Sequence, residues 1–203
     1  MSLFKRLLNP NYKSEEKARR AGKSGESSYY PEQKLPIDEK FTYNFKNNGG
    51  KFIYCENWKE ILEAFDNIMA ENDWYEQEVF CVNEMLIKKF DGFNLNFGKN
   101  TDSKFFLSTC ESLVSNNGSI LLSSNQIKEK KLKELPTNVV IFATTSQIVD
   151  TISEGLRIIK NQSSGYIPSN ITTIQDFETE KEKDFMSYGS STKNLYLLLL
   201  EDL

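Results

Sequence analysis

Few residues of this chain have side chains that commonly do chemistry, and histidine is absent from all 203 positions. Its absence excludes Ser-His-Asp and Cys-His nucleophile pairs, an imidazole general base, and zinc or haem held by histidine. The three cysteines, Cys55, Cys81 and Cys110, lie far apart and form no C-x-x-C pair. The chain alone therefore cannot supply four thiolates to an iron–sulfur cluster. We expect no metal site and no other cofactor.

A row of hydroxyl side chains is the first candidate binding site. Thr144, Thr145 and Ser146 follow the apolar run 139–142, which predicts a buried strand. Thr144 and Gln147 have the spacing of a capping box, so we expect a helix to begin here. Hydroxyls and free backbone N–H groups at the start of a helix favour a carboxylate or a phosphate. The alternative is that these hydroxyls only cap the helix.

Glu111 and the polar bend that follows it are the second candidate. Glycine permits a positive φ angle, so Gly118 between Asn117 and Ser119 would let a ligand approach the backbone closely. The alternative is an ordinary hairpin turn, in which Asn-Gly is a favoured pair. Glu111 is the only candidate for a general base, and the residues alone assign no catalytic role, so whether the chain is an enzyme stays open.

The elements that would position these residues follow an alternating pattern. Residues 51–55 predict a strand, and residues 57–72 predict a helix with Asn57 as N-cap and Glu60 in capping-box spacing. A second strand over 78–82 and a short helix over 83–90 complete a strand–helix–strand–helix order. This order is typical of an α/β fold with an open, mainly parallel sheet and flanking helices.

The second half of the chain adds more strands and one helix. The helix is expected over 147–160, and the strands are expected over 105–107, 112–114, 119–122, 139–142, 171–174 and 195–200. Ligands of open α/β sheets bind outside the carboxyl ends of the strands. We therefore expect the polar bend before Ile120 and the hydroxyls after Phe142 to meet at a common edge of one sheet.

Charge and composition divide the chain into a basic, partly disordered N-terminal arm, residues 1–40, and a domain over residues 41–203. Residues 1–34 hold eight Lys/Arg and four Asp/Glu, whereas the remaining residues hold 17 basic and 25 acidic side chains and carry −8. The arm could touch an anionic membrane surface weakly, touch nucleic acid, fold back on the domain, or remain a solvated tail.

Other partners and compartments are constrained by what the sequence lacks. Basic and aromatic residues are not interleaved, so we expect no nucleic-acid partner. The longest aliphatic and aromatic run, residues 195–200, is far shorter than the roughly 20 residues of a membrane span. The start of the sequence does not have the pattern of a signal peptide, and an odd number of scattered cysteines suits a reducing cytoplasm.

Four stretches in order resemble the LUD domain, also called the YkgG or lactate-utilisation protein C family. In residues 110–121, Glu111 takes an acidic position of the family and Gly118-Ser119 takes the place of Gly-Thr. The other stretches are residues 135–149, the Pro-Ser-x-x-x-x-Ile stretch of residues 168–174, and Tyr188-Gly189-Ser190 with residues 195–200. The family motif Gly-Pro-Ser-Arg/Lys-Thr-Ala-Asp-Ile-Glu is absent between Ile174 and Tyr188, and Tyr188 stands in place of a family histidine.

The resemblance implies a fold like that of sugar-phosphate isomerases and CoA-transferases. It also implies an accessory role in the oxidation of L-lactate to pyruvate, with iron–sulfur proteins as partners and no metal of its own. The resemblance suggests only four pocket residues in this chain, for a small carboxylate or phosphate: Glu111, Asn117, Gly118 and Ser119. One alternative is a non-catalytic ligand-binding or regulatory module that kept the fold and lost the site. Another is a small enzyme for a phosphorylated or acyl substrate, with Glu111 as base.

Overall fold

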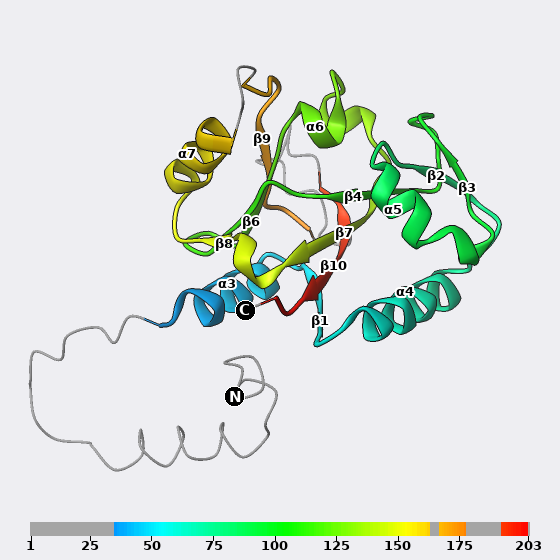
Figure 1. Ribbon diagram of the computed structural model, residues 1–203, viewed down its shortest axis with the longest axis horizontal. Helices are drawn as coiled ribbons and strands as arrows, with labels where there is room; N and C mark the ends of the chain where they lie inside the picture. Colours follow the sequence, from blue (N-terminus) through cyan, green and yellow to red (C-terminus); the bar gives the residue numbers. More distant parts are fainter. Residues whose placement is uncertain (1–34, 163–166, 178–191, 203) are drawn as a thin grey trace, which may run out of the picture.

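A six-stranded parallel sheet forms the centre of the computed structural model, which describes residues 35–162, 167–177 and 192–202 (Figure 1). The strand order is β1-β10-β7-β4-β2-β3, and every neighbouring pair runs parallel. The strands are β1 (Lys51–Cys55), β2 (Glu78–Phe80), β3 (Asn96–Gly98), β4 (Phe105–Thr109), β7 (Asn138–Thr144) and β10 (Asn194–Leu200). The predicted α/β fold with an open parallel sheet is confirmed.

A second sheet of four strands packs on one face of this main sheet. Its order is β8-β5-β6-β9, with β5 and β6 as an antiparallel hairpin and β8 parallel to β5. Its strands are β5 (Ser112–Val114), β6 (Ser119–Leu122), β8 (Ile148–Val149) and β9 (Thr172–Ile174). Helix α7 (Ile152–Gln162) packs against its other face through Val114, Leu121 and Ile159.

Helices α4 (Trp58–Asn72) and α5 (Glu84–Lys89), with the 3₁₀ turn η1 (Asp91–Phe93), belong to the other face of the main sheet. The expected cap of α4 is present, because the Asn57 side chain accepts from Glu60 N at 3.1 Å and the Glu60 carboxylate accepts from Glu56 N at 2.8 Å. Ile61, Phe65 and Ile68 of α4 are buried. Side chains one turn apart thus form the apolar face that the sequence predicts.

Helix α3 (Ile37–Asn47) lies between the second sheet and β1 on the remaining part of the main sheet (Figure 1). Its Phe41 and Phe45 are fully buried in the core between the two sheets. Strand β10 supplies Leu195, Leu197 and Leu199 to that same core and turns Tyr196 and Leu198 toward α4. Both faces of β10 are therefore buried, which explains its uninterrupted apolar sequence.

The predicted start of the helix expected over residues 147–160 is wrong. Gln147 ends the 3₁₀ turn η3 (Thr145–Gln147), residues 148–149 form β8, and the helix begins only at Ile152. Ile148 and Val149 pair with Leu113 and Val114 of the second sheet. The tertiary contact therefore overrides the helical spacing of the isoleucines. The strands predicted over 51–55, 112–114 and 119–122 have the predicted bounds, and the other predicted strands differ by one or two residues at their ends.

Two short elements, α6 (Ser124–Ile127) and the 3₁₀ turn η2 (Leu132–Glu134), connect β6 to β7. The domain boundary expected at residue 40 falls within α3, which begins at Ile37. Residues 1–34 of the expected arm, and Tyr188 with most of the segment before it, lie outside the described residues. Within the described ranges no helix has both the length and the apolar character needed to cross a bilayer.

Candidate functional site

The carboxyl ends of β4 and β7 are joined by the side chain of Gln147. Its amide oxygen accepts from Thr144 N at 2.9 Å, and its amide nitrogen donates to the backbone oxygen of Cys110 at 2.7 Å. Glu111 follows Cys110, and Thr145 follows Thr144. Glu111 and the hydroxyl residues thus lie at the same edge of the main sheet, at the ends of two neighbouring strands.

A carboxylate from the chain itself is held by the hydroxyl cluster, which we define as Thr144, Thr145 and Ser146. Asp202 Oδ1 accepts from Thr145 Oγ1 and from Ser146 N, both at 2.9 Å. Asp202 Oδ2 accepts from Ser146 Oγ at 2.7 Å. Two hydroxyls and one backbone N–H thus converge on a single carboxylate, and charge-assisted hydrogen bonds of this kind are about twice as strong as neutral ones.

The cluster favours the ionised form of the carboxylate that it holds. Burial alone raises the pKa of Asp202, but the hydrogen bonds from Ser146, Thr145 and Thr144 outweigh burial, so the pKa lies below its ordinary value of 3.8. Donors that stabilise the charged form lower an acid's pKa. The cluster is therefore chemically suited to an anionic carboxylate, and the external ligand that the sequence predicts here, a carboxylate or a phosphate, stays a prediction.

Glu111 is held by the first residues of α6. Its Oε1 accepts from Ser123 Oγ at 2.6 Å and from Asn125 Nδ2 at 2.9 Å. Ser123 is fully buried and caps α6, since its hydroxyl also accepts from Asn125 N. Glu111 is half-buried. One of its oxygens therefore organises α6, and the assignment of Glu111 as a base stays a prediction.

The polar bend of residues 115–119 lies at the other end of the β5–β6 hairpin from Glu111, because Val114 pairs with Ser119 whereas Ser112 pairs with Leu121. It belongs to the second sheet, so the expectation that bend and hydroxyl cluster share an edge of one sheet is wrong. The structure brings Glu111 and the hydroxyl cluster together, and it places Asn117, Gly118 and Ser119 elsewhere.

Helix α3 covers this bend. The Asn44 side chain donates to the backbone oxygens of Ser115 and Asn116 at 2.8 and 3.2 Å, and the Asn48 side chain donates to Asn117 O at 2.7 Å. Gly118 has φ +67°, and a Cβ atom there would lie 2.4 Å from the backbone of Asn44. The sequence predicts that a ligand approaches the backbone at Gly118, whereas in the structure the backbone of helix α3 lies there.

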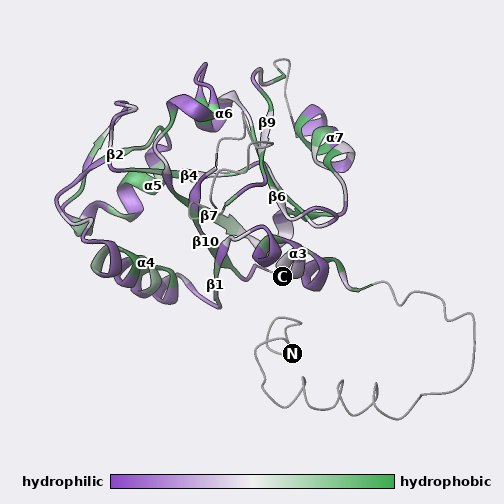
Figure 2. Cartoon of the chain, turned by 180° about the vertical axis from the view of Figure 1, so that it is seen from behind, coloured by the Kyte–Doolittle hydropathy of each residue, from purple (hydrophilic) through white to green (hydrophobic). Residues whose placement is uncertain are grey.

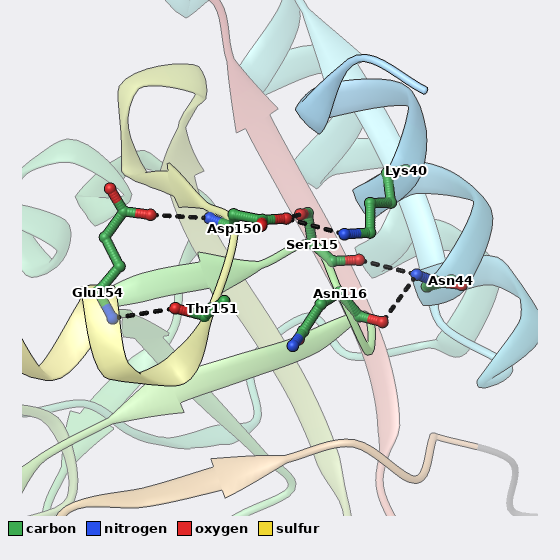
Figure 3. A network of polar contacts seen from close by, with 7 residues as sticks. All are labelled: Lys40, Asn44, Ser115, Asn116, Asp150, Thr151 and Glu154. Atoms are coloured by element: carbon green, nitrogen blue, oxygen red, sulfur yellow. Dashed lines mark hydrogen bonds and ion pairs between the residues drawn. The ribbon is translucent and has the colours of Figure 1, made fainter. Parts of the chain in front are cut away.

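A charged network continues from the bend to the start of α7 (Figure 3). Asp150 Oδ1 accepts from Ser115 Oγ at 3.0 Å and pairs with Lys40 Nζ of α3 at 2.8 Å. Asp150 N donates to Glu154 in the first turn of α7. The network joins α3, the bend and α7, and it is a structural connection between elements far apart in the sequence.

The cysteine thiols are poor nucleophiles. All three are buried, and burial raises the pKa of Cys55 and of Cys81 to about 11 and raises that of Cys110 as well. The thiolate is the reactive form, so a raised pKa suppresses reactivity. Within the ranges that the structure describes, no group of three or more acidic or cysteine side chains is arranged to hold a metal ion.

The sequence did not point to Asp202, Ser123 or Asn125 as parts of this region. Ser123 and Gln126 have capping-box spacing, and the box is present in the structure, so this spacing could have placed Ser123 at the start of a helix next to Glu111. Asp202 offers no local pattern. Only the pairing of Leu200 with Thr144 across the sheet brings Asp202 to the cluster.

The profile of the LUD domain family matches residues 96–199 of this chain. The chain belongs to the LUD domain family. The matched segment of the LUD domain begins at the first residue of β3 and includes the hydroxyl cluster, Glu111 and the bend. The resemblance seen in the sequence is confirmed.

A solved structure supports the fold of this LUD-domain protein. The crystal structure of a DUF162 family protein from Deinococcus radiodurans superposes with a TM-score of 0.55 and 12% sequence identity, over 82% of this chain and 96% of that chain. At this identity the likeness concerns the fold. Among curated proteins, none matches the chain significantly.

Proposed function

We propose that this LUD-domain protein is an accessory component of a lactate-utilisation system, in which L-lactate is oxidised to pyruvate, and that it contributes by binding a small carboxylate at the hydroxyl cluster. Membership of the LUD domain family supports the pathway. The hydrogen bonds from Thr145 and Ser146 to the Asp202 carboxylate support a carboxylate as the ligand, and they are the observation that carries the proposal.

An external carboxylate would take the place of Asp202. Asp202 is exposed and follows the end of β10, so its side chain could turn away from the cluster without opening the core. The incoming carboxylate would accept from the same three donors, Thr145 Oγ1, Ser146 N and Ser146 Oγ. Asp202 therefore competes with the ligand, and its removal should tighten ligand binding.

The side chains around the cluster favour a binding role. Oxidation of lactate requires an acceptor for two electrons, and hydroxyl, carboxylate and amide groups hold a substrate but do not accept electrons. We therefore assign the oxidation step to partner proteins with iron–sulfur clusters. Glu111, at the same edge, would orient a ligand through the oxygen that Ser123 and Asn125 leave unused.

The runner-up is a regulatory module that kept the LUD fold and does not bind lactate or pyruvate. The observation that favours it is the cover of α3 over the bend, where side-chain amides of Asn44 and Asn48 already occupy the backbone oxygens of residues 115–117. The two candidates differ in whether the hydroxyl cluster takes an external ligand.

Calorimetric titration with L-lactate and with pyruvate separates them. We expect Asp202→Ala to bind at least one of these acids more tightly than the wild type does, because the competing carboxylate is gone. Asp102→Ala is the matched control, since it removes an exposed aspartate from the loop before β4. Thr145→Val combined with Ser146→Ala and Asp202→Ala should abolish the binding. Absence of binding in Asp202→Ala would favour the regulatory module.

Growth on L-lactate tests the pathway separately. Deletion of the gene should slow growth and lactate consumption when L-lactate is the carbon source, and the wild-type gene should restore both. The Thr145→Val/Ser146→Ala gene should restore them less well. Unchanged lactate consumption in the deletion strain would contradict the assignment to lactate utilisation.

A further inference from the structure

Four exposed lysines stand close together on the segment that leads from α6 to β7. We call residues 128–134 the lysine loop; its lysines are Lys128, Lys130, Lys131 and Lys133. Figure 2 shows the segment after α6 in the colour of hydrophilic residues. The loop leads to the amino end of β7, whereas the hydroxyl cluster lies beyond the carboxyl end of that strand. The two surfaces are therefore separate.

The backbone of the lysine loop is held in place. The Asn170 side chain donates to the backbone oxygens of Lys128 and Lys130 at 2.9 and 2.8 Å, and Lys130 N donates to Ile127 O at 3.1 Å. Lys128 adopts φ +54°, which these contacts stabilise. A preformed loop loses little conformational freedom when a partner binds, so its charges act together.

Each of the two glutamates of the loop accepts one hydrogen bond, although both residues are exposed, as the four lysines are. Glu134 Oε2 accepts from Lys131 N at 2.6 Å, and Glu129 Oε1 lies 3.5 Å from Ser169 Oγ. Across the described ranges, no ion pair involves any of the four ammonium groups. The four lysines outnumber the two glutamates, so the loop presents a local positive charge.

The charge around the loop selects the kind of partner. Residues 35–203 carry −8 in total, so a long polyanion such as duplex DNA or a lipid surface would also meet the acidic remainder of the domain. A short acidic segment of a protein would cover the loop alone and would avoid that repulsion. We propose that the lysine loop is a docking surface for an acidic segment of a partner protein.

Fluorescence anisotropy with a labelled peptide of glutamate and aspartate residues tests this proposal on the full chain. The test variant changes all four lysines of the loop to glutamine. The control variant has the same net charge and changes four exposed lysines elsewhere, Lys59, Lys88, Lys99 and Lys160. Both variants keep the basic residues of the N-terminal arm, and both should show the far-UV circular dichroism of the wild type.

We expect the loop variant to bind the peptide about tenfold more weakly than the control variant near physiological ionic strength, with a flatter dependence on salt. Equal weakening in both variants, or no peptide binding by the wild type, would overturn the proposal. Tighter loop-dependent binding of duplex DNA or of phosphatidylglycerol vesicles would also overturn it. The loop variant should bind L-lactate as the wild type does. A failure of this proposal can therefore be told apart from a failure of the proposed carboxylate site.

Discussion

Asn44 of α3 donates its side-chain amide to the backbone oxygen of Ser115 at 2.8 Å, across 71 positions of the sequence. Asn44 lies outside the segment matched by the LUD domain profile, and Ser115 lies inside it. The contact fastens the N-terminal part of the fold to the hairpin of the second sheet. Substitutions at this junction should lower the stability of the protein, whereas one substitution in the core should leave it unchanged or raise it.

Asn44→Ala should lower the free energy of unfolding by about 1–3 kcal/mol, because the change leaves the oxygens of Ser115 and Asn116 without this donor. Urea unfolding followed by circular dichroism measures the loss. Tyr43→Ala is the control on the same helix, since Tyr43 is 62% exposed and should matter little. Equal losses in the two variants would show that the junction contributes nothing specific.

Gly118→Ala should be more harmful than Asn44→Ala. The added Cβ would sit 2.4 Å from the backbone of α3, and the residue would have to keep φ +67°. We expect a loss of about 3 kcal/mol or more, seen as a lower urea midpoint. Gly92→Ala is the matched control, because a Cβ there meets nothing within 4 Å. A Gly118→Ala protein as stable as Gly92→Ala would contradict the packing of α3 on the bend.

Ser108→Ala should leave stability unchanged or raise it. The Ser108 hydroxyl is buried in β4, and it has no hydrogen-bond partner among the residues that the structure describes. Removing a buried polar group that makes no bond relieves its desolvation penalty. Ser119→Ala provides the contrast, since Ser119 Oγ donates to Asn117 Oδ1 at 2.8 Å and its loss should cost about 1 kcal/mol. A clear destabilisation by Ser108→Ala, measured by thermal unfolding, would show that the hydroxyl is satisfied in solution.

Lys193 should make stability depend on pH. The residue is 3% exposed, its ammonium group donates to the backbone oxygens of Leu135 and Pro136, and burial lowers its pKa from 10.5 to about 8. The unfolded chain therefore binds more protons than the folded chain between pH 8 and 10.5, so the free energy of unfolding should rise with pH across this window. The full contribution is about 3 kcal/mol.

The cysteines act in the opposite direction, because burial raises the pKa of each thiol above its ordinary value of 9.0 and stability falls once the unfolded thiols ionise. The clean measurement is therefore the difference in unfolding free energy between the wild type and Lys193→Met at each pH. That difference should move in favour of the wild type from pH 8 to 10.5. A constant difference would mean that Lys193 has its ordinary pKa in the folded protein.

Local patterns in the sequence predicted local structure well. The cap of α4 at Asn57 and the apolar spacing behind it involve residues within a few turns, so the sequence alone contains the information. The apolar run of residues 139–142 likewise predicted a buried strand, and these residues lie in β7. Gly118 was expected to permit a positive φ, and its φ is +67°.

Contacts between distant residues could not be predicted in the same way. The second sheet depends on the pairing of Leu113 with Ile148 and of Ile120 with Ile174, and no local spacing encodes such pairs. Asp202 reaches the hydroxyl cluster only because β10 lies beside β7. The hydroxyls of Thr145 and Ser146 led to the prediction of an anionic ligand, which stays a prediction, whereas their contact with Asp202 could be found only from the fold.

The position of β10 also sets the order in which the chain can assemble during translation. Strand β10 lies between β1 and β7, and in the described part of the chain β1 pairs with no other strand. During translation β1 therefore cannot pair until β10 has been synthesised, about 140 residues later. Nascent chains should keep β1 accessible to chaperones until residue 200 has left the exit tunnel, and premature termination before β10 should leave a split sheet with two unpaired edges.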